Sequence, residues 1–302
     1  MMKLGSSVGL MSLFVFMACS VLAQGPLTPP GAPAPTMRTL QQIEPRTPIT
    51  NVPYTITQPG SYYLAGNMSS TGTAITIRTN FVTLDLSGFS LNGPGSLSSA
   101  IGISISNGAE VVGTSIRNGI IQDFGGGGIV AFNSRQGVYE NLILHANGIF
   151  LQANGGAVSG NRISGCTTYH FSSSGRGIQF LQISGFVEAN RVEYNLINGG
   201  EYGIRFIGNN GFIRGNTILY NQVIDTSDHA IQTQGRSGRI EGNHMYSSTA
   251  SGFPFGPAGL ASTGPANFIF ENTVSGSYGG YGLNSNDVVG PINPRIEGYE
   301  HL

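Results

Sequence analysis

The sequence lacks tryptophan, has a single lysine and carries charge on only 10% of its residues. Because the formal net charge is −1, nothing in the composition indicates nucleic acid or an anionic membrane as a partner. The only lysine is Lys3, so 13 arginines supply the cationic side chains of the rest of the chain. Chemistry that requires a lysine is therefore excluded beyond the N-terminal segment.

Cysteine is almost as scarce, with Cys19 and Cys166 as the only two. Cys19 lies in a segment that we expect to be removed, and a lone thiol cannot form an internal disulfide. We therefore expect Cys166 to be a small buried core residue.

The first 50 residues have the composition of a leader and a linker. Lys3 is followed by an apolar run over 10–22 and by small residues before Gln24, which predicts a signal peptide over 1–23 and a secreted, periplasmic or cell-surface protein. The residues around Cys19 leave open a lipid anchor. Residues 24–50 are predicted to be a Pro-rich linker and N-terminal cap, with a short capping helix over 36–43.

Glycine is abundant, with 46 residues, but it shows no three-residue period, so a collagen-like chain is excluded. The glycines instead mark a longer repeat, in which a small residue precedes Ile or Leu. These starts are Gly128-Ile129, Gly148-Ile149, Gly177-Ile178, Gly203-Ile204, Ala230-Ile231 and Gly259-Leu260. Thirteen residues after each small residue stands an asparagine: Asn141, Asn161, Asn190, Asn216, Asn243 and Asn272.

A repeat of 20 to 29 residues is typical of a solenoid. Its apolar residues alternate within short runs and are mostly Ile and Val, which indicates strands and not helices. The sequence therefore predicts an all-β solenoid of about nine coils over 51–290. Residues 291–302 are expected to form a C-terminal tail or cap.

In such a solenoid each strand pairs with its copy one coil along, so that equivalent residues stack in columns. We expect Asn161, Asn190, Asn216 and Asn243 to form one such column. Their side-chain amides would hydrogen-bond from coil to coil, and their backbone would adopt the left-handed conformation of the turn.

Two segments carry a family resemblance, namely 56–64 (ITQPGSYYL) and 82–88 (VTLDLSG). Together with the repeats they resemble the opening coils of uncharacterised secreted members of the pectate-lyase-like superfamily. The resemblance implies a single-stranded right-handed parallel β-helix and a role on carbohydrate, but it covers lyases, hydrolases, epimerases and adhesins alike. The Arg-x-Lys pattern of polygalacturonase-like hydrolases is absent, because no lysine remains after Lys3.

Column positions also predict a site, because loops of variable length lead into each start. Two residues before successive starts stand Glu201 and Asp228, which should lie one strand spacing apart. One residue before the starts stand Arg176, Tyr202 and His229. We name Glu201, Asp228, His229 and Arg176 as catalytic candidates. The substrate-binding candidates are Tyr202, His170, Asp225 and Arg205.

Three uses of this edge stay open. Two neighbouring carboxylates would serve as the acid and base of a glycosidase or lyase, with Arg and His holding an acidic sugar. They would equally suit Ca²⁺, although no complete set of metal ligands is evident. The third interpretation is that polar loop ends bond only to their neighbours, in a non-catalytic surface or adhesive protein.

Two further surfaces follow from the same columns. Glu188, Arg214 and Glu241 are expected to form a charge ladder beside outward aromatics at Phe186, Phe212 and Phe268. A third face, with Arg162, Arg191, Glu193, His244 and Tyr246, is expected to be solvated. Taken together, the sequence predicts a monomer that binds or processes an extracellular polysaccharide.

Overall fold

The computed structural model describes residues 44–145, 147–170, 175–208, 212–247, 259–276, 280–291 and 293–294. These residues form short strands joined by turns, and they contain no α-helix. None of the described segments is a helix long and apolar enough to cross a membrane. The predicted leader, the capping helix over 36–43 and most of the tail lie outside the described residues.

The strands form two parallel sheets. The larger sheet has 19 strands: β1 (Thr47–Ile49), β3 (Gly60–Leu64), β4 (Met68–Ser69), β6 (Val82–Asp85), β7 (Ser90–Gly95), β10 (Ser115–Phe124), β13 (Val138–His145), β15 (Arg162–Ser164), β16 (Thr167–Tyr169), β18 (Arg191–Glu193), β19 (Leu196–Asn198), β22 (Thr217–Leu219), β23 (Gln222–Ile224), β25 (Arg239–Glu241), β26 (His244–Ser247), β28 (Phe268–Phe270), β29 (Thr273–Gly276), β31 (Val288–Val289) and β32 (Asn293–Pro294). The second sheet has 13 strands: β2 (Tyr54–Ile56), β5 (Ile75–Ile77), β8 (Ile101–Ile105), β9 (Val111–Val112), β11 (Gly127–Phe132), β12 (Ser134–Arg135), β14 (Ile149–Ser159), β17 (Arg176–Glu188), β20 (Tyr202–Ile207), β21 (Ile213–Arg214), β24 (Ile231–Thr233), β27 (Leu260–Ser262) and β30 (Tyr281–Gly282).

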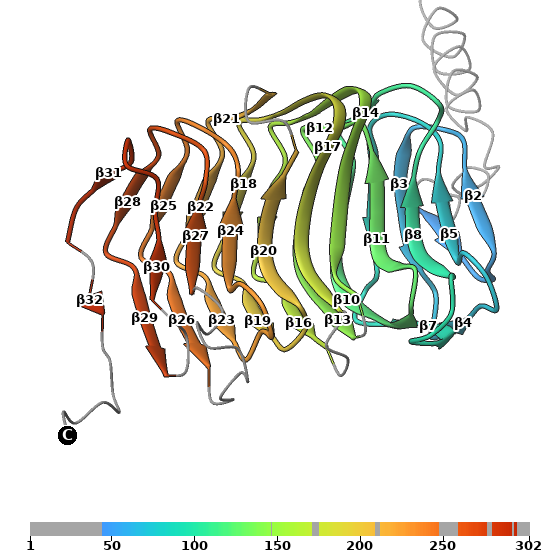
Figure 1. The fold of residues 1–302 in the computed structure, drawn as a ribbon. Helices are drawn as coiled ribbons and strands as arrows, with labels where there is room; N and C mark the ends of the chain where they lie inside the picture. Colours follow the sequence, from blue (N-terminus) through green and yellow to red (C-terminus); the bar gives the residue numbers. More distant parts are fainter. Residues whose placement is uncertain are drawn as a thin grey trace, which may run out of the picture. The chain divides into compact units, whose positions relative to one another are not determined.

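The chain is a right-handed parallel β-helix, as the sequence predicts. In the second sheet one path of ten strands runs β2-β5-β8-β11-β14-β17-β20-β24-β27-β30, with one strand from each coil (Figure 1). Between two of these strands the chain passes through the larger sheet and returns, so neighbours in the stack are neighbouring coils. The solenoid has about eight turns, close to the nine or so coils that the sequence predicts.

The repeat starts form one continuous row, as predicted. Ile149 pairs in register with Ile129 on one side and with Ile178 on the other, and the row continues through Ile204 and Ile231 to Leu260. All of these side chains are buried. Each such burial stabilises the fold by roughly 1.5–3 kcal/mol relative to an exposed side chain, so the row explains why these positions are aliphatic.

The small residue before each start has a steric cause. A Cβ on Gly148 would lie 1.9 Å from the carbonyl oxygen of Gly177, and one on Gly203 would lie 2.4 Å from the Val223 side chain. At this position the chain enters the second sheet close to the neighbouring coil and to the opposite wall of the core. Glycine fits because it has no side chain to place there.

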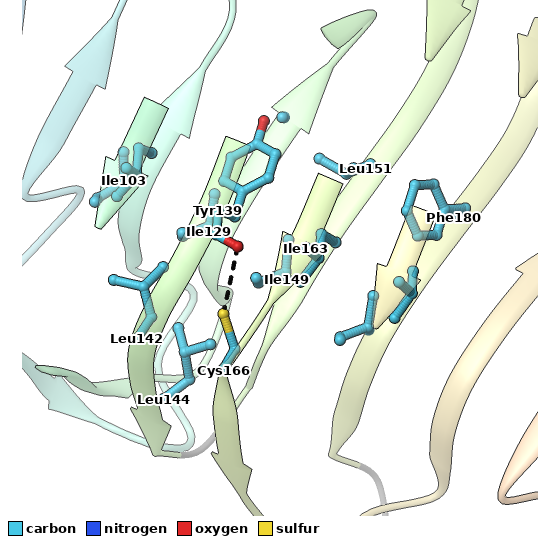
Figure 2. Packing of buried hydrophobic residues seen from close by; sticks show 14 of the residues in the cluster. Ile103, Ile129, Tyr139, Leu142, Leu144, Ile149, Leu151, Ile163, Cys166 and Phe180 are labelled. Carbon is cyan, nitrogen blue, oxygen red and sulfur yellow. Dashed lines mark hydrogen bonds between the residues drawn. The ribbon is translucent and has the colours of Figure 1, made fainter. Parts of the chain in front are cut away.

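The core between the sheets is a stack of similar layers. Ile103, Ile129 and Ile149 follow one another along the wall of the second sheet, opposite Leu144 and Ile163 from the larger sheet (Figure 2). Further along, Phe180 and Phe206 are register partners on adjacent coils, and their rings stack with centroids 4.2 Å apart. Like residues therefore meet like residues along the solenoid.

The asparagine column is where the prediction was wrong in part, because there are two columns and not one. In the first, the Nδ2 of Asn161 donates to the Oδ1 of Asn190 at 2.9 Å, and Asn190 donates to Asn216 in the same way. In the second, Asn195 donates to Asn221, Asn221 to Asn243, and Asn243 to Asn272, at 2.9–3.0 Å. Asn243 therefore does not lie in a row with Asn161, Asn190 and Asn216.

The left-handed backbone also lies one residue earlier than expected. In the first turn Gly160, Ala189, Gly215, Ser237 and Ala266 have φ between 53° and 63°, and each directly precedes a column position. The corresponding residues of the second turn are Gly165, Tyr194, Tyr220, Gly242 and Glu271. The column asparagines use their side chains to bridge coils, and their neighbours make the turn. Asn141 differs, because it is itself left-handed with φ 53°.

A shortening of the later coils explains the error. The two columns are five residues apart, as Asn190 and Asn195 show, and the coils that start at Ala230 and Gly259 lack five residues before the first column. A fixed offset from the start therefore reaches the first column in the middle coils and the second column in the later ones. For the same reason Glu241 and Arg239 pair with Phe270 and Phe268, and Glu241 does not join Glu188 and Arg214 in a ladder.

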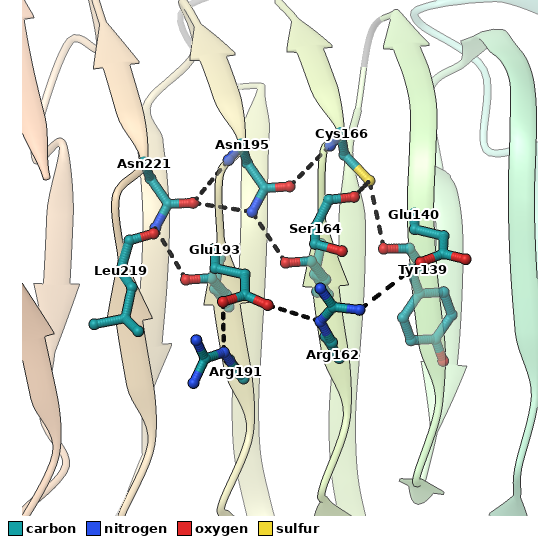
Figure 3. Close-up of polar contacts among 12 residues, drawn as sticks. Tyr139, Glu140, Arg162, Ser164, Cys166, Arg191, Glu193, Asn195, Leu219 and Asn221 are labelled. Atoms are coloured by element: carbon teal, nitrogen blue, oxygen red, sulfur yellow. Dashed lines mark hydrogen bonds and ion pairs between the residues drawn. The ribbon is translucent and has the colours of Figure 1, made fainter. Parts of the chain in front are cut away.

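Cys166 occupies a position in the second asparagine column. Its backbone N–H donates to the Oδ1 of Asn195 at 3.0 Å, as the asparagines do, and its Sγ lies 3.6 Å from the carbonyl oxygen of Tyr139 (Figure 3). The residue is buried, as expected, and burial raises the pKa of the thiol to about 12. The thiol thus stands where the next asparagine amide would be.

We predict that Asn221→Ala lowers the free energy of unfolding by about 3 kcal/mol, because buried donors and acceptors of the neighbouring coils lose their partners. Asn221 is 1% exposed and bonds to Asn195 and Asn243. Denaturant unfolding measures the change. The matched control is Asn286→Ala, at an exposed position, for which we expect a change within about 0.5 kcal/mol.

Cys166→Asn is expected to extend the second column by one amide and to raise the free energy of unfolding by about 1 kcal/mol. The new Nδ2 would donate to the Tyr139 carbonyl that the Sγ now faces. Cys166→Ser, which has no amide, is the comparison in the same unfolding experiment. If Cys166→Asn is less stable than Cys166→Ser, the prediction is wrong, because the core at this coil then has no room for the asparagine side chain.

Candidate functional site

The residues that precede the starts of β20 and β24 stack from coil to coil. Tyr202 pairs in register with Arg176 of the preceding coil. The backbone N–H of Asp228 donates to the carbonyl of Glu201 at 3.0 Å, and that of Gly203 donates to the carbonyl of His229 at 3.1 Å. The register of the buried starts therefore extends back to the candidate residues.

Tyr202 is the centre of a polar cluster at this edge. Its ring stacks on that of His229 with centroids 6.1 Å apart and an angle of 11° between the planes. The guanidinium carbon of Arg205 lies 3.7 Å from the centre of the Tyr202 ring, and the phenol hydrogen-bonds to Asp228. We call Tyr202, Arg205, Asp228, His229 and Gln232 the Tyr202 cluster.

Charge and burial both favour the neutral phenol. Burial raises the pKa of Tyr202, and the hydrogen bond with Asp228 raises it further, to about 12, although Arg205 acts in the opposite sense. Tyr202 is therefore a proton donor at neutral pH, when its hydroxyl is fully protonated.

Arg205 and His229 each contact a neighbouring polar side chain. The Nε of Arg205 donates to the Oε1 of Gln232 at 2.6 Å, and Gln232 is its register partner on β24. The Nδ1 of His229 lies 2.5 Å from the Oδ1 of Asp228, although it forms no directed hydrogen bond. Arg205 is thus held by a residue of the next coil, whereas His229 contacts the residue that precedes it on its own coil.

The other four predicted residues have different surroundings. Glu201 is partly buried beside Tyr202, and Arg176 has an exposed side chain one coil away. His170 is only 8% exposed and packs against Gly175, where a Cβ would approach its Nδ1 to 2.6 Å. Asp225 makes a left-handed turn, with its N–H bonded to the carbonyl of Tyr246. The structure thus brings Tyr202, Arg205, Asp228 and His229 together, whereas His170 lies in the interior of the edge.

The sequence analysis missed two glutamines. Gln179, Arg205 and Gln232 form one outward row, and each stands two residues after the small residue of its start. Gln179 is 3% exposed, and its Oε1 makes no hydrogen bond within the described structure. The constant offset was the signal that could have identified both residues, because it places them beside Arg205.

The calcium alternative finds no support in the parts of the chain that are described. Nowhere in them do three or more His, Cys, Asp or Glu residues gather in a way that could hold a metal ion. Glu201 and Asp228 lie on adjacent coils, but Asp228 already bonds to the phenol of Tyr202 and lies beside the imidazole of His229.

The face expected to be solvated instead contains a buried carboxylate. Glu193 is 3% exposed and accepts hydrogen bonds from the Nε atoms of Arg162 at 2.7 Å and Arg191 at 2.5 Å (Figure 3). Arg162 also lies 3.9 Å from Glu140. Burial alone would raise the pKa of Glu193, but the two arginines outweigh it and hold the pKa below its ordinary value.

Comparison with known proteins adds only distant structural likenesses. No protein-family model matches the chain, and no curated protein matches it. Among solved structures, the Dettilon tailspike protein is 13% identical with a TM-score of 0.41, and the match covers 82% of this chain and 60% of the tailspike. The A-module of the Azotobacter vinelandii mannuronan C-5 epimerase AlgE6 is 14% identical with a TM-score of 0.35, and the match covers 85% and 89%. Neither likeness assigns an activity to this chain.

Glu193 leads to a prediction about acid stability. Because its pKa is lower in the folded protein, its contribution to stability is complete above the ordinary glutamate pKa of about 4.3 and is lost as pH falls through the folded value. We expect the stability advantage of the wild type over Glu193→Gln to shrink below about pH 4. Urea unfolding across this range measures it. The control is Glu140→Gln, which changes a more exposed partner of Arg162 and should alter this pH dependence less.

Proposed function

We propose that the protein binds an acidic extracellular polysaccharide at the Tyr202 cluster. The observation that carries the proposal is the fixed orientation of Arg205, whose guanidinium lies on the Tyr202 ring while its Nε donates to Gln232. With Nε occupied, the two terminal NH₂ groups are the donors left for a ligand. Two parallel donors from one guanidinium match the two oxygens of a carboxylate.

The neighbours of Arg205 suit the rest of a sugar acid. Tyr202 and His229 present ring edges and polar atoms, and Gln232 with Asp228 offers acceptors for hydroxyl groups. Such a mixture of aromatic and hydrogen-bonding groups is typical of polar ligand sites. The predicted signal peptide over 1–23 supports a ligand outside the cytoplasm.

A second candidate function, cleavage by β-elimination, is favoured by the contact between Asp228 and His229. The Asp228 carboxylate lies beside Nδ1 of His229, and Nε2 is the nitrogen that would take the proton from the ring carbon that bears the carboxylate of a uronate. The electron pair of that C–H bond would form a ring double bond as the adjacent C–O bond to the next sugar breaks. The departing oxygen would take the proton of Tyr202, and Arg205 would neutralise the carboxylate during the step.

Hydrolysis fits the cluster less well than elimination. A glycosidase needs one free carboxyl group as acid and a second carboxylate as nucleophile or base. Asp228 already bonds to Tyr202 and contacts His229, so it is not free for either role. The non-catalytic alternative needs only Arg205 and its orienting partners.

The test separates binding from chemistry. We expect Arg205→Ala to weaken binding of polygalacturonate and polymannuronate at least about tenfold, because a charge-assisted pair is lost. His229→Gln keeps Arg205 and Gln232, so it should bind more tightly than Arg205→Ala. Affinity electrophoresis measures binding, and the ultraviolet absorbance of an unsaturated uronate measures elimination.

Arg117→Ala is the matched control, because Arg117 is a half-exposed arginine that pairs with Asp85 on the other sheet. Unchanged binding in Arg205→Ala would reject the proposal. Elimination by the wild type that is lost in His229→Gln would identify a lyase. Binding without any unsaturated product would identify a non-catalytic glycan-binding protein.

A further inference from the structure

A groove lies at the opposite edge of the second sheet, where β17 and β21 turn into the larger sheet. It encloses about 610 Å³ and is lined by Glu188, Ala189, Arg214, Gly215, Arg236, Ser237, Pro265 and Ala266. None of these residues belongs to the Tyr202 cluster, which lies at the beginning of β20 and β24, whereas the groove lies at the end of β17 and β21. The two surfaces therefore lie at opposite ends of the second-sheet strands.

The floor of the groove is formed by small left-handed residues. Ala189, Gly215, Ser237 and Ala266 come from four successive coils and share the same turn position, with φ between 53° and 60°. At the matching position of the second turn stand Tyr194, Tyr220 and Glu271, so the backbone tolerates large side chains there. The floor spans three coil spacings, or about 14 Å.

The charge along the groove is not balanced within the described residues. Arg214 and Arg236 are bridge partners on adjacent coils, so two like charges stand side by side. One carboxylate, Glu188, bonds to Arg214 at 2.9 Å, whereas Arg236 is exposed and has no ion pair in the described part of the chain. Like charges on neighbouring strands destabilise a sheet, and a bound anion would relieve the repulsion.

An exposed aromatic pair lies beside the groove, next to Arg214. Phe186 and Phe212 are 42% and 40% exposed, and their rings meet edge to face at 5.3 Å. The guanidinium of Arg214 lies 6.0 Å from the centre of the Phe186 ring, so the aromatic pair adjoins the charge. Exposed rings beside a cation match a ligand that has an apolar ring face and an acidic substituent.

We propose that this groove, which we call the Arg236 groove, binds an acidic oligosaccharide a few sugar rings long. Its carboxylate or sulfate groups would meet Arg236 and Arg214, while its rings would lie over the small floor residues beside Phe186 and Phe212. The site is separate from the Tyr202 cluster and needs neither Arg205 nor any proton transfer.

The experiment uses the full chain with Arg205→Ala, so that ligand bound at the Tyr202 cluster does not contribute. The probe is trigalacturonate, with neutral maltotriose and the acidic peptide triglutamate as comparisons, in calorimetric titrations at low ionic strength. We expect this protein to bind trigalacturonate more tightly than either comparison. Adding Arg236→Ala should weaken that binding about tenfold or more, since a guanidinium–carboxylate pair is lost.

Two further variants separate charge from shape. Ser237→Tyr keeps every charge but fills the floor in the way that Tyr220 fills the second turn, and it should also weaken binding. Arg239→Ala is the matched control, because Arg239 is an exposed arginine three residues away that pairs with Glu241 outside the groove.

The outcomes are decisive for this surface alone. No binding by the Arg205→Ala protein, or binding that Arg236→Ala leaves unchanged, would overturn the inference whatever the fate of the Tyr202 cluster. Equal affinity for triglutamate would overturn the assignment to a saccharide. Equal affinity for maltotriose would remove the role of charge.

Discussion

The structure depends on parallel register between successive coils. Each strand gives its backbone hydrogen bonds to the same segment one coil along, so every side chain has its counterpart within one strand spacing of about 4.8 Å. This constraint is severe, because any residue that suits one coil must also suit the contact with the next. It explains why aliphatic residues continue the row of Ile178 and Ile204, and why a glycine before each of them leaves room for the neighbouring backbone.

The asparagine columns maintain this register at the turns, where regular strand pairing is interrupted. One Oδ1 accepts both the backbone N–H and the side-chain amide of the preceding coil, as Asn221 does for Asn195. The same Asn221 donates to the carbonyl of Val192 and to the Oδ1 of Asn243, so a single side chain bonds to groups of the preceding and the following coil. Without such partners these buried groups would each cost about 1–3 kcal/mol. The left-handed residue before each asparagine can then vary in size, since only its backbone is constrained.

The sequence predicted the features that follow directly from register between coils. The prediction was wrong where a fixed number of residues after the start no longer reaches the same structural position in every coil. The row from Ile129 to Leu260 could be predicted because each start is marked by its own small residue. The offset to asparagine held six times, yet Asn141 is a turn residue and the other five asparagines divide between two columns. The reason is that five residues separate the columns and five are missing from the later coils. Asn195 and Asn221, each five residues after a predicted column member, were the signal that a second column exists. Side-chain partners across coils, such as Gln232 for Arg205 and Glu193 for two arginines, depend on rotamers and burial that offsets do not encode.

Variation in coil length is also what places chemistry at the edges of this solenoid. Where register is strict, side chains must repeat, and a surface of repeated residues gives little discrimination between ligands. At Tyr202 and His229 the loops before the strands differ, so an aromatic ring, an imidazole and a guanidinium can adjoin although they stand on different coils. At the other edge the coil that follows β21 is five residues shorter, and this places Arg236 beside Arg214, so that two like charges adjoin. The row of outward aromatic residues that contains Phe186 and Phe212 ends at this coil. Both surfaces thus arise where successive coils differ in length but their strands still stack. At these places residues of different types are held one strand spacing apart, because the buried rows keep the backbone in register.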